Sequence, residues 1–304
     1  MAQPSLQPIG IQQLHRPTEP AEVDIVAVHG LNGDALKTFT HEDSEVLWLR
    51  DLLPTYIKTA RVLSWGYNSN ANTLRGRATS ADRILEHART LVEDLQSDRE
   101  LENATERPII FVCHSLGGIV VKKALTFSSW QTSPKCARLH TIYTCTYGIL
   151  FFGTPHNGSS KAKPLHTAQK LASALIPRQG AVFESGLVRA LKEGSETLEM
   201  ITSEFAPLMP RFRIFLFWEE QRTGLKYTKD YIVTSDSAAP AVEDSERCGI
   251  PADHRGMCKF QDVNSPRFRT VLAALKRYSS AAPTVIKSRV AQNADIAASW
   301  YQTI

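Results

Sequence analysis

Features that mark secreted or membrane-spanning chains are missing from this sequence. Residues 1–20 hold four prolines and several glutamines, without the basic start and apolar core of a signal peptide. No apolar run reaches the ~20 residues that a membrane-spanning helix requires. We therefore expect an intracellular protein, cytoplasmic or peripheral to an organelle membrane.

Cysteine is scarce, and its spacing matches no known framework. The chain has five cysteines, an odd number, and no C-x-x-C pair. Neither a disulfide framework nor a zinc site is indicated, which favours a reducing compartment. The glycine-rich stretch at residues 29–33, with Lys37 and Thr38, lacks the glycine that a phosphate loop needs before its lysine, because Leu36 stands there. We expect no metal and no cofactor.

Carboxylate side chains are absent between Glu106 and Glu184. The formal net charge of +4 is mild and does not suggest a nucleic-acid partner. Clustered positive charge in this interval predicts attraction to anionic partners such as anionic membranes, and a solvated basic face is the alternative. The basic residues concerned are Lys122, Lys123, Lys135, Arg138, Lys161, Lys163, Lys170 and Arg178.

Apolar, β-branched runs alternate along the chain with segments of helical periodicity. About six strands are expected, near residues 23, 61, 109, 147, 211 and 231, the last at residues 231–234. Helices are expected at residues 46–53, 80–95, 117–128 and 266–277, and residues 164–210 read as a small helical cap. This alternation predicts an α/β fold with a mainly parallel sheet flanked by helices.

Three regions follow from these patterns. Residues 1–21 read as a flexible leader, because they are rich in proline and show no periodicity. Residues 22–278 hold all the predicted strands and form the main domain. Residues 279–304 read as a linker with a weak helix outside the fold.

The stretch at residues 109–120 combines an apolar strand, a serine and the opening of a helix. This is the layout of a nucleophile elbow, in which a tight strand-to-helix turn holds a serine above the edge of a sheet. The turn requires small residues two positions before and after Ser115. Gly117 meets this requirement, and Cys113 stands where glycine is usual. The alternative is that Ser115 is an ordinary helix N-cap.

A nucleophilic serine needs a base and an orienting carboxylate, which in hydrolases of this layout follow in the order serine, acid, histidine. His254 is the histidine beyond the penultimate strand, so its position makes it the candidate base. Glu219 and Glu220 end the strand that follows the cap. Strand alternation makes their side chains diverge, so only one can face the site. We choose Glu219, with Glu220 as the fallback. A solvated loop histidine and a solvated strand end are the alternatives.

Two backbone amides are candidates for the oxyanion hole. The loop after the first predicted strand supplies one such N–H in serine hydrolases, here that of Leu31, and the residue after the nucleophile, Leu116, supplies the other. His29, His114 and His156 begin or line loops at the same edge of the predicted sheet, and we interpret them as shaping the site.

Six motifs stand in one order within residues 22–277: HGLNG at 29–33, WLRD at 48–51, CHSLGG at 113–118, FGTPHNGS at 152–159, FWE at 217–219 and DHRGM at 253–257. Together they resemble the lipase-like serine esterase domains of fungal NLR-type proteins. Those domains are relatives of the serine-active-site protein family and, more distantly, of GPI inositol-deacylases. The resemblance implies an α/β-hydrolase fold, a triad of Ser115, Glu219 and His254, and lipid-ester substrates.

The leading functional hypothesis is thus a serine esterase acting through an acyl-enzyme. One alternative is a signalling or interaction module that keeps the fold but does little chemistry. Another is an acyltransferase using the same intermediate. The resemblance also implies an effector domain of a fungal NLR-type protein, although no Walker A motif follows the predicted hydrolase domain.

Overall fold

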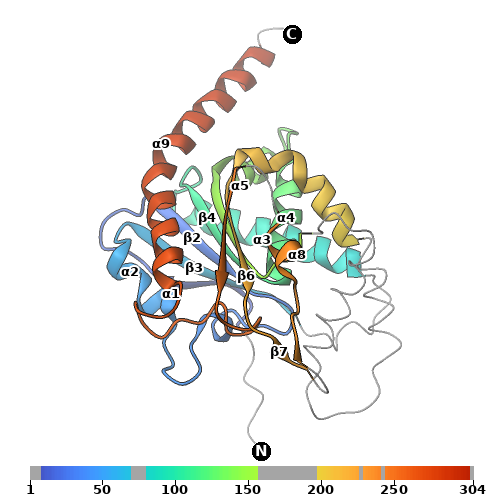
Figure 1. Ribbon diagram of the computed structural model, residues 1–304. Helices are drawn as coiled ribbons and strands as arrows, with labels where there is room; N and C mark the ends of the chain where they lie inside the picture. Colours follow the sequence, from blue (N-terminus) through green and yellow to red (C-terminus); the bar gives the residue numbers. More distant parts are fainter. Residues whose placement is uncertain (1–7, 70–79, 157–196, 226–228, 241–243, 302–304) are drawn as a thin grey trace, which may run out of the picture.

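The computed structural model describes residues 8–69, 80–156, 197–225, 229–240 and 244–301. Within these residues, seven strands form one sheet in the order β1-β3-β2-β4-β5-β6-β9 (Figure 1). β1 pairs antiparallel with β3, and all other neighbouring strands pair in parallel. The predicted α/β architecture with a mainly parallel sheet is confirmed. The strands are β1 (Gly10–His15), β2 (Val23–Val28), β3 (Ala60–Gly66), β4 (Ile109–His114), β5 (Thr146–Phe152), β6 (Arg213–Glu219) and β9 (Ser245–Ile250).

Helices cover both faces of the sheet (Figure 1). α3 (Ser80–Leu101) and α4 (Leu116–Ser129) pack together on one face, and α9 (Phe268–Tyr301) crosses the other, near α1 (Trp48–Asp51) and α2 (Leu53–Tyr56). Every residue of the central strands β2 and β4 is buried, as a two-sided cover requires. The remaining elements are η1 (Lys37–Phe39), α5 (Ala137–Cys145), η3 (Ala206–Arg211), β7 (Thr223–Gly224), β8 (Lys229–Asp230) and α8 (Ser235–Ala238).

The amino-terminal region differs from the prediction of a flexible leader. Residues 10–15 form the edge strand β1, which pairs with β3 and packs Ile11 and Leu14 against the core. Two glutamines stand between these apolar residues, so the run has neither clean alternation nor β-branched enrichment. Pairing with β3, rather than local propensity, determines this strand.

The last parallel strand also differs from the prediction. Residues 231–234 are not a strand, and the edge position is taken by β9, which pairs with β6 from Ser245 to Ile250. β9 has the sequence SERCGI and is largely solvent-accessible along its first four residues, so it lacks the apolar signature of a buried strand. Ile232 and Val233 are buried for another reason, because they pack near the end of β6.

The carboxyl-terminal helix is longer than predicted. α9 continues through Pro283 to Tyr301, where a linker was expected after residue 278. Its buried face carries Tyr278, Ala282 and Ile286. Further along, Arg289 donates hydrogen bonds to the carbonyl oxygens of Thr146 and Arg211, which fixes the helix against the body of the protein.

Two smaller predictions concern helices. The single helix expected at residues 46–53 is two short helices, and Pro54 lies in the first turn of α2, where its missing N–H is not needed. Most of the cap predicted at residues 164–210 lies outside the described residues. Within the described part, residues 197–205 are helical and η3 follows them.

A buried ion cluster joins β2, β3 and α3 near the amino ends of the strands. Asp24 is fully buried, and its carboxylate accepts hydrogen bonds from Arg61 at 2.8 Å, Arg99 at 2.6 Å and Arg107 at 3.0 Å. Burial alone would raise the pKa of Asp24, but the three guanidinium groups outweigh it and lower the pKa below its ordinary value.

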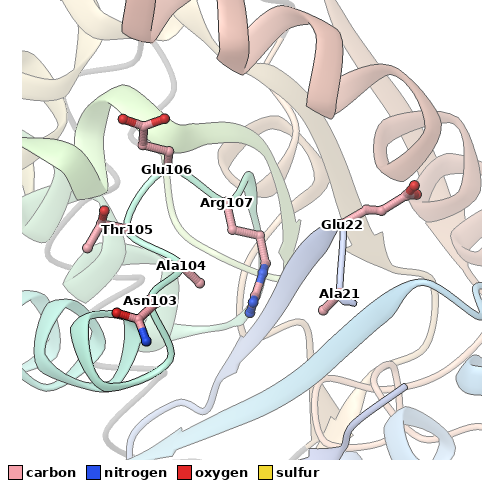
Figure 2. A pocket seen from close by; sticks show the side chains of 7 residues that line it. All are labelled: Ala21, Glu22, Asn103, Ala104, Thr105, Glu106 and Arg107. Carbon is pink, nitrogen blue, oxygen red and sulfur yellow. The ribbon is translucent and has the colours of Figure 1, made fainter. Parts of the chain in front are cut away.

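Beside this cluster, a polar hollow of about 360 Å³ opens to solvent. It is lined by the residues that precede β2 and by the loop between α3 and β4 (Figure 2). Figure 2 shows the guanidinium of Arg107 between Ala104 and Ala21, while the carboxylates of Glu22 and Glu106 point away from it. The hollow lies at the amino ends of the strands, and the loops described below lie at the carboxyl ends.

Removing the buried carboxylate should destabilise the fold strongly. Asp24→Asn removes the carboxylate that three arginines share, and within the described residues only Arg61 keeps another carboxylate partner, Asp98 at 2.6 Å. We expect this substitution to lower the free energy of unfolding by about 3–5 kcal/mol, measured by urea denaturation at pH 7. Because the folded-state pKa of Asp24 lies below the unfolded value of 3.8, its contribution is complete above that pH and is lost as pH falls through the folded-state pKa.

The matched control is the exposed pair of Arg138 and Glu93. Glu93→Gln should change stability by less than about 1 kcal/mol, because solvent screens this pair. Equal losses in Asp24→Asn and Glu93→Gln would contradict the importance of the buried cluster.

Candidate active site

Ser115 occupies a strained turn between β4 and α4. Its φ of 52° and ψ of −123° place a non-glycine residue outside the ordinary regions of backbone conformation, at a cost of about 1–3 kcal/mol. It stands at the N-cap position of α4, but its side chain makes no capping hydrogen bond. The hydroxyl Oγ lies instead 2.9 Å from Nε2 of His254. The structure therefore disfavours the N-cap alternative.

Close packing explains the small residues around this turn. A Cβ atom on Gly117 would lie 2.4 Å from the carbonyl oxygens of both Val28 and His29, and one on Gly30 would lie 2.9 Å from Cβ of Ser115. Cys113 is completely buried and forms part of the main core, so the sheet accommodates its thiol where glycine is usual.

His254 lies in the loop that follows β9, and its ring faces the end of β4. The ring is buried, with Nε2 toward Ser115 and Nδ1 at 3.0 Å from Oε2 of Glu219. This second contact is close, but the two atoms are not aligned as a hydrogen bond. Such contacts often tighten only when substrate is bound. Gly153 backs the ring, since a Cβ atom there would lie 2.9 Å from Cε1 of His254.

Glu219, rather than Glu220, faces this histidine. The Glu219 side chain is buried at the end of β6, where Oε1 accepts hydrogen bonds from the backbone N–H groups of Ile232 and Val233. Glu220 points to another side of the strand and packs on Gly249, where an added Cβ would lie 2.1 Å from its Oε1. Strand alternation thus separates the two carboxylates, as the sequence predicted.

The loop after β2 carries Leu31, and α4 begins with Leu116. Within the described residues, neither backbone N–H donates a hydrogen bond to a protein acceptor. His29 shapes the loop: its Nδ1–H donates to the carbonyl oxygen of Gly30 at 2.9 Å, and its Nε2 accepts the N–H of Tyr67 at 3.2 Å. Burial lowers the pKa of His29 to about 4, so the ring stays neutral at pH 7 and keeps both bonds.

The other two histidines named from the sequence are also buried. Nε2 of His114 lies 2.8 Å from the carbonyl oxygen of His254, and burial lowers the pKa of His114 to about 3. The ring of His156 packs edge-on against Phe151, and burial lowers its pKa well below the ordinary value. Neither ring contacts Ser115 in the way that His254 does.

Sequence reasoning missed three contributions to this site. Thr223 accepts the backbone N–H of His254 through its Oγ1 at 3.0 Å, and the amides of Ile232 and Val233 hold Glu219. These residues belong to an excursion between β6 and α8 that carries no recognisable motif. The excess of apolar residues at 231–233 was a signal of burial, but it was interpreted as a strand.

The described members of the basic interval do not form one exposed face. Lys122 is completely buried, Lys123 pairs with Glu204 at 2.6 Å and Arg138 pairs with Glu93 at 2.6 Å. Among the described members, Lys135 remains exposed without such a pair. Lys161, Lys163, Lys170 and Arg178 lie outside the described residues.

Solved structures share this fold. Among solved structures, the lipase BlEst2 of Bacillus licheniformis in its mature form is similar, with a TM-score of 0.54 and 18% sequence identity, and the match covers 86% of this chain and 97% of that one. A likeness at this identity shows the fold, which is that of the α/β-hydrolases.

The family follows from the sequence match. The family described as "Putative serine esterase (DUF676)" matches residues 23–184, and this chain belongs to it. Protein SERAC1 of Bos taurus is 27% identical over 274 residues, which is 82% of this chain and 38% of that protein. Protein SERAC1 of Danio rerio is 27% identical over 286 residues, 86% of this chain and 40% of that protein. The chain thus spans about two fifths of the length of these relatives.

No helix in the described part of the chain is long and apolar enough to cross a membrane.

Lys122, on the nucleophile helix, should limit stability at neutral pH. Within the described residues its ammonium group has one hydrogen bond, to Oγ1 of Thr202 at 3.3 Å, and burial lowers its pKa from 10.5 to about 7. The unfolded chain therefore binds this proton more tightly than the folded one. The destabilisation is complete below about pH 7 and fades as pH rises toward the unfolded value of 10.5.

Lys122→Met should raise the free energy of unfolding by a few kcal/mol at pH 6, since each unit of pKa shift corresponds to about 1.4 kcal/mol. The rise in stability between pH 7 and 10 should also become shallower, which denaturation at several pH values measures. Lys123→Met is the control and should not stabilise, because Lys123 is paired with Glu204. A less stable Lys122→Met variant would contradict this account.

Proposed function

We propose that this chain is a serine esterase that cleaves carboxylic esters through Ser115, His254 and Glu219. One observation carries the proposal: Oγ of Ser115 lies 2.9 Å from Nε2 of His254, whose Nδ1 lies 3.0 Å from Glu219. These are the mutual positions that a nucleophile, its base and an orienting carboxylate need. Membership in a serine esterase family supports the same reaction class.

In the proposed reaction, Ser115 loses its hydroxyl proton to Nε2 of His254 as Oγ attacks the ester carbonyl carbon. The resulting imidazolium then gives that proton to the departing alcohol, which leaves an acyl group on Ser115. A water molecule, deprotonated by the same Nε2, attacks the acyl carbon and releases a carboxylic acid. Glu219 keeps the proton of the resting histidine on Nδ1 and stabilises the imidazolium.

The oxyanion that forms in each half of the reaction needs preorganised donors. We assign this role to the backbone N–H groups of Leu31, in the loop after β2, and of Leu116, at the start of α4, which have no protein acceptor within the described residues. Removing one such donor from a hydrolase typically costs about 3 kcal/mol of transition-state stabilisation.

A lipid-type ester is the substrate class that the surroundings of Ser115 favour. Leu116 packs against a small apolar cluster, separate from the main core, that joins α3, α4 and the helical residues 197–205. Because Leu116 directly follows the nucleophile, we infer that an apolar acyl chain attached to Ser115 would extend toward this cluster. Its members are Ile84, Ile119, Leu198 and Ile201.

Substituting a member of the proposed triad should lower the rate of ester hydrolysis, whereas substituting a neighbouring carboxylate should not. Ser115→Ala should abolish ester hydrolysis, and Glu219→Gln should lower kcat by about 10³–10⁴-fold through the wrong histidine tautomer. Glu220→Gln is the matched control and should stay near the unsubstituted rate. The measurement is steady-state hydrolysis of a p-nitrophenyl ester series from acetate to palmitate.

Full activity in Ser115→Ala would remove this serine as the nucleophile. Equal losses in Glu219→Gln and Glu220→Gln would contradict the assignment of the acid. Faster hydrolysis of acetate than of longer esters across the series would contradict the lipid-type substrate.

Peripheral contact with anionic membranes is a separate proposal, and the exposed side chains of Trp130 and Lys135 near the end of α4 support it. At 20 mM salt, vesicles containing anionic lipid should retain more protein than neutral vesicles, and 0.5 M salt should abolish the difference because it screens surface charge. Sedimentation of the protein with each type of vesicle measures this. Equal retention by both vesicle types would contradict the proposal.

The role of an effector domain in a fungal NLR-type protein is also a proposal. It rests on the six motifs in their order, from residues 29–33 to residues 253–257.

A further inference from the structure

The excursion between β6 and α8 begins directly after Glu219. It contains the antiparallel ribbon of β7 and β8, in which Thr223 pairs with Asp230 and Gly224 with Lys229. The two described ends of this excursion form hydrogen bonds with different residues of the site. Thr223, at its start, contacts His254, while the amides of Ile232 and Val233, at its end, contact Glu219.

The contact between Thr223 and His254 is buried and directional. Oγ1 of Thr223 accepts the backbone N–H of His254 at 3.0 Å, and the two residues are 1% and 4% exposed. A buried amide that loses its acceptor pays a desolvation cost, so this bond restrains the loop.

A second hydrogen bond holds the same residue from the opposite side. The carbonyl oxygen of His254 can only accept, so the ring nitrogen Nε2 of His114, 2.8 Å away, must carry the proton and donate it. His114 directly precedes Ser115, so this bond ties the backbone of the base to the strand that carries the nucleophile. The two imidazole rings lie 5.0 Å apart.

We propose that Thr223 and His114 are positioning residues, which hold the backbone N–H and C=O of His254 and thereby fix its imidazole against Oγ of Ser115. This inference rests on the proposed function. His254 lies on a loop, and loops are more mobile than strands. A misplacement of about 1 Å in a reacting group can lower a rate by about 100-fold, so a base on a loop requires such restraint.

The first test compares Thr223→Val with Thr223→Ser. Valine keeps the shape of threonine but has no acceptor, while serine keeps the hydroxyl. In Thr223→Val, the amide of His254 should lose hydrogen-exchange protection by at least about tenfold, measured by NMR, and in Thr223→Ser it should keep it. The rate of labelling by a fluorophosphonate probe should fall by about 10–100-fold in Thr223→Val only.

The second test uses His114→Met and His114→Gln, which have similar shapes. Glutamine can place an amide N–H close to the position of Nε2, and methionine cannot. Labelling by the probe should fall in His114→Met and recover at least in part in His114→Gln. If Thr223→Val failed to fold, this pair would carry the same comparison.

The outcomes separate the two proposals. If the unsubstituted protein did not react with the probe, the proposed function would fail, and the exchange of the His254 amide would still decide the positioning role. Unchanged protection in Thr223→Val would overturn that role. So would equal losses of labelling in Thr223→Val and Thr223→Ser, or in His114→Met and His114→Gln, because a merely structural effect would not follow the hydrogen bond.

Discussion

Parallel strand pairing is the constraint on which the candidate site depends. Because β2, β4, β6 and β9 run in the same direction, the loops at their carboxyl ends meet at one edge of the sheet. Four distant parts of the chain therefore converge: Leu31 after β2, Ser115 after β4, Glu219 at the end of β6 and His254 after β9. The turn at Ser115 packs closely against this frame, since the carbonyl groups of Val28, at the end of β2, and of His29 leave room only for glycine at position 117. The buried ion cluster around Asp24 lies at the amino ends of the strands. It therefore occupies the edge of the sheet opposite to the candidate active site.

Three titratable side chains near the site are held neutral by burial. The pKa values of His29 and His114 fall to about 4 and about 3, and that of His156 falls well below the ordinary value. Neutral rings of fixed tautomer act as hydrogen-bond donors and acceptors, which is how His29 orders the Leu31 loop and how His114 contacts His254. The contacts of each ring therefore distinguish the histidines that shape the site from His254, whose ring contacts Ser115.

Much of the fold could be predicted because local sequence patterns indicate its helices and strands. The buried strands β2 to β6 consist mostly of apolar residues. The steric demands of the elbow single out Ser115 and Gly117, and alternation along β6 separates Glu219 from Glu220. The edge strands β1 and β9 could not be predicted, because their polar sequences take strand conformation from pairing. Thr223 left no signal at all, since its role depends on a hydrogen bond to a residue 31 positions away. α9 was underestimated because Pro283 argues for a helix end, while packing by Ile286 and Arg289 continues it.

The most direct measurement of the central claim is a crystal structure of the protein after reaction with a fluorophosphonate. The account predicts one covalent bond, from phosphorus to Oγ of Ser115, with His254 within hydrogen-bond reach of the adduct. It also predicts that the phosphonyl oxygen faces the backbone N–H groups of Leu31 and Leu116. An adduct on any other residue, or a phosphonyl oxygen directed away from both amides, would contradict it.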